Sequence, residues 1–168
     1  MLVPHASLIP FGARRKIDTL LPALKQSAHA FHLAGSWYFR AATADSDVDL
    51  YVEYSPEAHE YLRSQGFAIM GANPDYPDNP SQGADLRGHV TSNTVAIYQH
   101  ATLPVQVQAF ADLALALRMR DILARVFPDE HARTRGPHRH QMWAAAETAA
   151  RTILALQTPP TVNPTASA

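Results

Sequence analysis

The sequence predicts an α+β (α/β-like) fold in which helices flank a mixed β-sheet. Three observations carry this prediction: helical spacing of apolar residues near both ends of the chain, short apolar or alternating runs between them, and an order of helix, strand, turn, strand and helix followed by further strands. The chain has 168 residues, of which 46% are apolar and 17% are charged. This length and composition suit one domain with a buried core.

The N-terminal part is predicted to be helical after an irregular arm. Residues 1–11 contain two prolines and no clear period, so no regular element is expected there. From Gly12 to about His29, apolar residues recur at helical spacing. Pro22 lies inside this pattern, and a proline in a helix interior removes a hydrogen bond. We therefore expect a kink or a break into two short helices.

Short strands and one well-marked helix follow. Ser55-Pro56-Glu57 is typical of a helix start, because it offers a serine N-cap, a proline at the first position and an acid in the first turn. This helix should run to about Gln65 and end at Gly66. The remaining elements expected here are a buried strand at Phe31–Ala34, a helical turn at Trp37–Ala42, an acidic strand at Asp47–Tyr54 and a brief strand at Phe67–Met70.

Residues 71–93 form a long segment rich in Gly, Pro, Asn, Asp and Ser. Loops of this length in a compact domain are usually functional or disordered. Its position favours a flap that faces a substrate, and an insertion far from the chemistry is the alternative.

The last part of the chain is predicted to form a hairpin and two helices. Thr94–Gln99 and Val105–Phe110 are strands separated by a short turn, and Asp112 caps a helix over Leu113–Val126. These elements complete a core over residues 12–127. Residues 128–157 add a charged irregular loop and an alanine-rich helix at Gln141–Gln157, and residues 158–168 form a Pro/Thr/Ala-rich tail expected to be disordered.

The most informative motif combines a Gly-Ser turn with two acids. Gly35 and Ser36 close an apolar run, and ten residues separate them from Asp47 and Asp49. Residues i and i+2 of a strand share one face, so the two carboxylates should project side by side. Such a pair holds protons unless a cation neutralises it, and Mg²⁺ prefers oxygen ligands that it shares with phosphates. The glycine and serine offer close backbone approach and hydrogen-bond donors to a phosphate.

This arrangement resembles the signature of the nucleotidyltransferase fold, the superfamily of DNA polymerase β, and is most similar to the small minimal nucleotidyltransferases. Arg40 and the Thr43-Ala-Asp-Ser-Asp run also fit that signature. The resemblance implies a mixed-sheet nucleotidyltransferase fold with flanking helices and a C-terminal helical extension. It implies Mg²⁺ (or Mn²⁺) as cofactor and a nucleoside triphosphate as partner.

The resemblance also implies roles for individual residues. Asp47 and Asp49 would be the catalytic metal ligands, and Gly35 and Ser36 would hold the β- and γ-phosphates. Arg40 would assist the leaving pyrophosphate or lie on the surface. Metal ions in such enzymes clamp the phosphates during in-line displacement at the α-phosphorus.

One part of the family pattern is missing. Active members bring a third carboxylate from a neighbouring strand, and Gln106 occupies that place here. A glutamine oxygen can ligate Mg²⁺ weakly, but it carries no charge and cannot act as a base.

Other acids do not obviously replace the third carboxylate. Glu53 lies about 13 Å beyond Asp49 along the strand, and Asp112 about 20 Å from Gln106. The acids of the long loop could swing in; these are Asp75, Asp78 and Asp85.

Two weaker signals have ordinary explanations beside the functional ones. His138-x-His140 could be a metal pair, but the charged segment Asp129–His140 is better explained as a solvated loop than as a basic lid. Four tyrosines could stack on a base, although packing is the simpler role for each; they are Tyr51, Tyr54, Tyr61 and Tyr98.

Composition limits the partners. The chain has no cysteine, and its net charge of −1 gives no general attraction to nucleic acid or anionic membranes. No segment reaches the roughly 18 apolar residues of a membrane span, and the N-terminus does not read as a signal peptide. A cytoplasmic protein without a membrane partner is therefore expected.

Two functions stay open at this point. The first is a Mg²⁺-dependent nucleotidyltransferase that moves a nucleoside monophosphate to a hydroxyl on a protein, a tRNA or a small molecule. The second is a catalytically inactive protein of the same fold that acts as a nucleotide-binding sensor, inhibitor or antitoxin-type partner, which Gln106 suggests. A third acid beside Asp47 and Asp49 would favour the first. A protein partner or a second copy of the chain is compatible with either.

Overall fold

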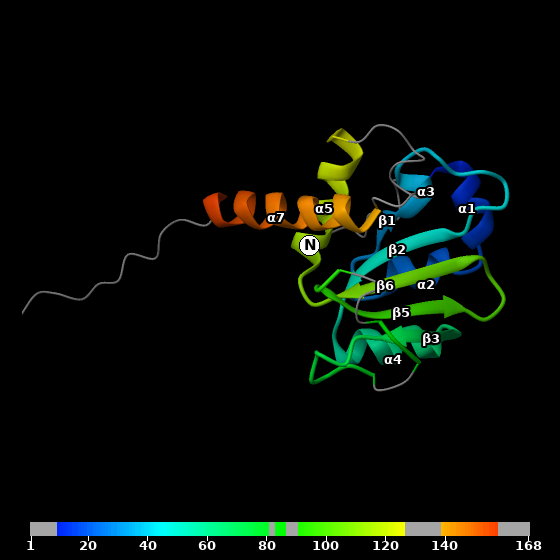
Figure 1. The fold of residues 1–168 in the computed structure, drawn as a ribbon. Helices are drawn as coiled ribbons and strands as arrows, with labels where there is room; N and C mark the ends of the chain where they lie inside the picture. Colours follow the sequence, from blue (N-terminus) through cyan, green and yellow to red (C-terminus); the bar gives the residue numbers. More distant parts are fainter. Residues whose placement is uncertain (1–9, 81–82, 87–90, 127–138, 158–168) are drawn as a thin grey trace, which may run out of the picture.

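The chain folds around one six-stranded mixed sheet with helices packed against it, which confirms the α+β class. The computed structural model describes residues 10–80, 83–86, 91–126 and 139–157. The strand order is β1-β2-β6-β5-β3-β4 (Figure 1). The predictions for most of the N-terminal arm, for residues 128–138 including His138, and for the tail at 158–168 lie outside the described residues.

The centre of the sheet is a parallel pair, and the other long pairings are antiparallel. β2 runs parallel to β6, while β1 and β5 flank this pair antiparallel. β3 pairs antiparallel with β5 and parallel with the two-residue β4. The strands are β1 (His32–Ala34), β2 (Val48–Glu53), β3 (Phe67–Ala72), β4 (Ala84–Asp85), β5 (Thr94–His100) and β6 (Val105–Phe110).

The helix signals read from the sequence match the structure. The predicted break separates α1 (Phe11–Ile17) from α2 (Leu21–Gln26), and Pro22 lies in the first turn of α2, where a missing N–H costs no hydrogen bond. Ser55 Oγ accepts a hydrogen bond from the Ala58 N–H at 3.1 Å and caps α4 (Pro56–Ser64). Asp112 Oδ1 accepts from the Leu115 N–H at 2.9 Å and caps α5 (Leu113–Val126).

Two boundaries and the long loop differ from the prediction. The helical turn α3 spans Gly35–Tyr38 and stops before Arg40, whose φ of 60° is incompatible with a continuing helix. α7 (Arg139–Gln157) starts two residues before the predicted Gln141. β3 extends to Ala72 and pairs with β4 inside the segment expected to be all loop.

Gly71 explains the difference at β3. A glycine after an apolar run indicates a turn, but a Cβ here would lie 2.4 Å from Leu86 Cδ2. The strand therefore carries a glycine because a neighbouring side chain packs on its backbone.

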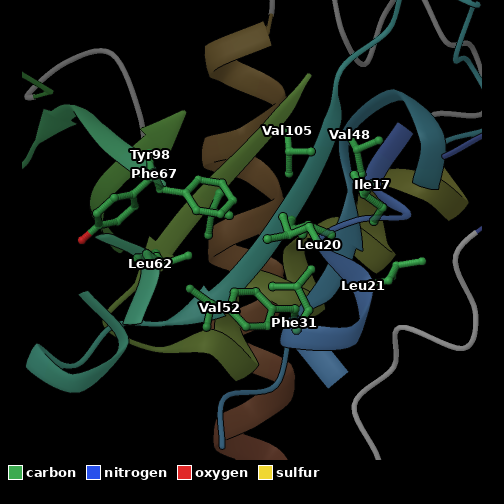
Figure 2. Packing of buried hydrophobic residues seen from close by; sticks show 14 of the residues in the cluster. Ile17, Leu20, Leu21, Phe31, Val48, Val52, Leu62, Phe67, Tyr98 and Val105 are labelled. Atoms are coloured by element: carbon green, nitrogen blue, oxygen red, sulfur yellow. The ribbon is translucent and has the colours of Figure 1, made fainter. Parts of the chain in front are cut away.

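One face of the sheet carries the main core. Alternate residues of the two central strands point toward α1, α2 and α4, and Figure 2 shows their side chains meeting in this layer. The strand residues in this cluster include Val48, Leu50, Val52, Val105, Val107, Ala109 and Tyr98, and the helices add Ile17, Leu24 and Leu62.

On the opposite face α5 packs against β2 and β6, and α7 packs against α5. Tyr51 and Phe110 pack on Ala116 of α5. A separate cluster joins α5 to α7 through Leu115, Met119, Leu123, Ala146 and Ala150. None of the helices in the described part of the chain is long and apolar enough to cross a membrane.

Truncating Leu50 tests the main core. Leu50 is 0% exposed, so Leu50→Ala should lower the free energy of unfolding by about 2–5 kcal/mol through lost burial and an unfilled cavity. Urea unfolding followed by circular dichroism measures this change. Leu156→Ala is the matched control, because Leu156 is 81% exposed and its loss should cost no more than about 0.5 kcal/mol. Equal costs for the two variants would contradict the assigned core.

Candidate functional site

A cavity of about 640 Å³ lies on the face of the sheet that is turned away from the main core. Its floor is formed by β2, β5 and β6, and α7 forms part of its wall. This volume falls in the range of small-molecule sites in proteins. The strand residues that line it are Asp49, Tyr51, Thr94, Ile97, Gln106, Gln108 and Phe110.

Of the two predicted carboxylates, Asp49 lines this cavity and Asp47 is not part of its lining. Asp49 is the second residue of β2 and is half-buried, whereas Asp47 is exposed and immediately precedes the strand. Burial and, to a smaller extent, the negative charge of Asp47 raise the pKa of Asp49, the positive charge of Arg139 partly offsets them, and the net result is a pKa of about 6. Within the described residues, the charge of Arg139 therefore offsets only part of the effect of burial and of Asp47 on Asp49.

Gly35 packs directly against the Asp49 carboxylate. Ala34 is the register partner of Asp49, so the next residue passes beside that side chain. A Cβ at Gly35 would lie 1.7 Å from Asp49 Oδ2, and the φ of Gly35 is +57°. Both facts require glycine at this position. The structure thus joins the Gly-Ser turn to the acidic strand in one site.

Of the remaining residues predicted from the sequence, two line the cavity and one does not. Ser36 and Gln106 line the cavity, and Gln106 is the register partner of Asp49 on the parallel strand β6. Arg40 is exposed and is not part of the cavity lining. The structure brings Gln106 to Asp49 and leaves Arg40 outside.

None of the acids considered in the sequence completes the pair as a third carboxylate. Over the described ranges, no group of three or more His, Asp or Glu side chains is arranged to hold a metal ion. Glu53 is exposed at the far end of β2, and Asp112 is engaged in capping α5. The loop acids Asp75, Asp78 and Asp85 are exposed and do not line the cavity.

Part of the long segment at 71–93 does border the cavity. Leu86, Thr91 and Ser92 contribute to its lining. The Ser92 backbone oxygen accepts a hydrogen bond from the Tyr76 hydroxyl at 2.6 Å, which ties this wall to the start of the segment. The segment is therefore adjacent to the site, as its position in the sequence suggested.

The tyrosines mostly serve packing. Tyr51 lines the cavity and its ring lies 4.6 Å from that of Phe110. Tyr98 is buried in the main core with its hydroxyl 3.0 Å from His59 Nδ1, and Tyr61 packs against the same core. The Tyr54 hydroxyl donates to the Asp78 backbone oxygen.

Sequence reasoning missed the contribution of α7. Arg139, Trp143 and Glu147 recur at intervals of four residues, so they share one face of the helix, and all three line the cavity. Glu147 Oε1 accepts hydrogen bonds from Ser92 Oγ at 2.8 Å and from Arg151 Nη2 at 2.7 Å. The four-residue spacing indicates from the sequence that the three residues share one face of a helix. Nothing in the sequence indicates which surface of the protein that face contacts.

Arg120 of α5 contacts the residues on both sides of the Gly-Ser turn. Its Nη1 donates to the Leu33 backbone oxygen at 2.6 Å, two residues before Gly35. Its guanidinium also lies 3.9 Å from the centre of the Tyr38 ring, and the Tyr38 hydroxyl donates to Asp121 at 2.7 Å. These contacts join α5 to β1 and α3, and so position the Gly-Ser turn.

Three oxygen-bearing side chains of the site suit one hard cation. The carboxylates of Asp47 and Asp49 and the side-chain oxygen of Gln106 are oxygen ligands of the kind that Mg²⁺ accepts, usually with water and phosphate in its other positions.

Searches against protein-family models, curated proteins and solved structures find no match to the chain. The inference about function therefore depends on the site itself.

Asp49→Asn should change how stability depends on pH in the absence of divalent cations. The pKa of Asp49 is raised from its ordinary 3.8 to about 6, so between these values the folded chain holds a proton that the unfolded chain has released. Stability must then fall as pH rises through this window. Asparagine mimics the protonated carboxyl, so the thermal midpoint of the variant should exceed that of the unsubstituted chain near pH 7 and converge with it below about pH 4.

Thermal unfolding in EDTA across this pH range measures the effect. Asp45→Asn, at an exposed position two residues before Asp47, is the control and should follow the unsubstituted chain. If Asp49→Asn also followed it, the raised pKa of Asp49 would be refuted.

Proposed function

We propose that this chain is a nucleotidyltransferase-like protein that binds a nucleoside triphosphate together with one Mg²⁺ (or Mn²⁺). The observation that carries the proposal is the close packing of Gly35 on the Asp49 carboxylate, with Asp47 beside it and Gln106 in register across β6. The α+β class, with a mixed sheet and flanking helices, is compatible with the family that the motif resembles.

Charge balance gives the physical reason for a cation. Two neighbouring carboxylates, one of them half-buried, are stabilised in the ionised form by a nearby positive ion. Asp47, Asp49 and the Gln106 side-chain oxygen would hold the ion. When bound, the ion would supply positive charge to neighbouring phosphate oxygens.

The same geometry favours binding without turnover. Gln106 stands opposite Asp49, where a third carboxylate would act, and an amide can neither accept a proton at neutral pH nor carry a negative charge. No other acid joins the pair in the part of the chain that the structure describes. A nucleotide-binding sensor, inhibitor or antitoxin-type partner is therefore the function best supported.

A second candidate is transfer of a nucleoside monophosphate to a hydroxyl acceptor. The retained acidic pair and the Ser36 hydroxyl at the cavity favour it, because they are the parts that position the triphosphate in the resembled family. The acceptor would be a protein, a tRNA or a small molecule.

Calorimetric titration with ATP, with and without Mg²⁺, tests the binding proposal. We expect saturable binding that requires the cation and that weakens at least about tenfold in the double variant Asp47→Asn/Asp49→Asn, because the ligands lose their charge. Asp45→Asn controls for charge near the site and should bind as the unsubstituted chain does. Binding that survives the double substitution would rule out the assigned cation site.

Restoring the third carboxylate tests the second candidate. Gln106→Glu should produce transfer of label from α-³²P-ATP to protein or bulk tRNA in the presence of Mg²⁺, at a rate well above that of the unsubstituted chain. Gln108→Glu is the matched control, because Gln108 lies on the same strand and lines the same cavity two residues further along. Absence of label transfer by both the unsubstituted chain and Gln106→Glu would count against the transfer function and leave the binding function standing.

A further inference from the structure

We propose that the Arg139, Trp143 and Glu147 face of α7 recognises the two ends of the nucleotide, with Arg139 binding its phosphates and Glu147 accepting a hydrogen bond from an amino group of its base. This inference rests on the proposed function and deepens it, because it names the ligand class that the cavity prefers: nucleotides whose base carries an exocyclic amino group.

The α7 wall and the β6 part of the floor border the cavity over similar lengths. Arg139 and Glu147 are eight residues apart on α7, which corresponds to about 12 Å along a helix. Gln106 and Phe110 are four residues apart on β6, which corresponds to about 13 Å along a strand. Both pairs line the cavity. The stretch of α7 that borders the cavity is therefore about as long as the stretch of β6 that borders it.

The Asp49 end of the cavity is the phosphate end. Arg139 lies close enough to Asp49 and Tyr51 for its charge to act on both side chains. A guanidinium has several N–H donors in a planar fork that matches phosphate oxygens. Arg139 and a cation on the acidic pair would therefore contact a triphosphate from two sides.

The Glu147 end of the cavity offers a hydrogen-bond acceptor that suits a base. The Glu147 side chain is 17% exposed, and its Oε1 is fixed by Ser92 Oγ and by Arg151. These contacts all use Oε1, and among the described residues no donor is assigned to Oε2. An ionised carboxylate only accepts hydrogen bonds, so Oε2 matches the amino group of adenine, guanine or cytosine and not the carbonyl that uracil has in its place.

The orientation follows from charge. A triphosphate is drawn to the end that holds Arg139 and the cation site, whereas the Arg151 guanidinium at the other end is already paired with Glu147. Trp143 lies between the two on the helix face, where its indole ring can stack on the nucleoside.

Binding of CTP and UTP in Mg²⁺ tests the base end, since these ligands differ at the 4-amino group of the base. The unsubstituted chain should bind CTP about tenfold more tightly than UTP, because a ligand without the donor leaves the partly buried Glu147 Oε2 unpaired. Glu147→Gln should abolish this preference, since its amide can present either a donor or an acceptor to the base. Glu60→Gln, an exposed acid on α4, controls for charge and should retain the preference.

ATP and adenosine test the phosphate end. Arg139→Gln should weaken ATP binding about tenfold and leave adenosine binding unchanged, while Arg139→Lys, which keeps the charge, should recover most of the loss. Arg63→Gln on α4 controls for net charge. Urea midpoints equal to that of the unsubstituted chain confirm that the variants fold.

The outcomes separate this inference from the proposed function. Cation-dependent ATP binding that is lost in Asp49→Asn but unaffected by Arg139→Gln, or equal affinities for CTP and UTP, would overturn the role of α7 and leave the proposed function intact. Absence of any nucleotide binding by the unsubstituted chain would overturn both.

Discussion

The parallel pairing of β2 with β6 is the constraint on which both the core and the candidate site depend. Its register places Asp49 opposite Gln106 and Leu50 opposite Val107, so alternate residues of both strands enter the main core and the residues between them face the cavity. A slip of one residue would move Leu50 into the cavity and Asp49 into the core. Burial of the apolar face thus fixes the position of the acidic residue, and the structure that stabilises the fold also builds the site.

The two ends of the cavity differ in the groups that surround their carboxylates. At one end Asp47 and Asp49 repel each other, and Arg139 offsets only part of this repulsion. At the other end Glu147 is held by Ser92 and Arg151. A ligand that brings a cation and phosphates to the first end and neutral polar groups to the second complements both. This distribution is the reason why we propose a nucleotide with one divalent ion as the ligand, and not a metal ion alone or an apolar molecule.

Local sequence signals predicted the parts of the fold that depend on neighbouring residues. Pro22 separates two helices, Ser55 caps α4, and the alternation around Asp49 marks a strand, because each effect acts within a few residues. Gln106 was found beside Asp49 because the resemblance supplied the order of strands. Gly71 was misleading, since the side chain that excludes a Cβ there comes from Leu86, far along the segment. The role of α7 could not be predicted, because helical spacing identifies a face but not the surface that it meets.

The central claim is that Asp47, Asp49 and Gln106 form a site for a single divalent ion in the presence of a nucleotide. Electron paramagnetic resonance of Mn²⁺, titrated into the protein with saturating ATP, counts the bound ions directly. We expect one Mn²⁺ per chain in the protein–nucleotide complex and its loss in Asp49→Asn. Two bound Mn²⁺ ions per chain would show that another group supplies the missing carboxylate, and either that result or binding unaffected by Asp49→Asn would contradict a single-ion site.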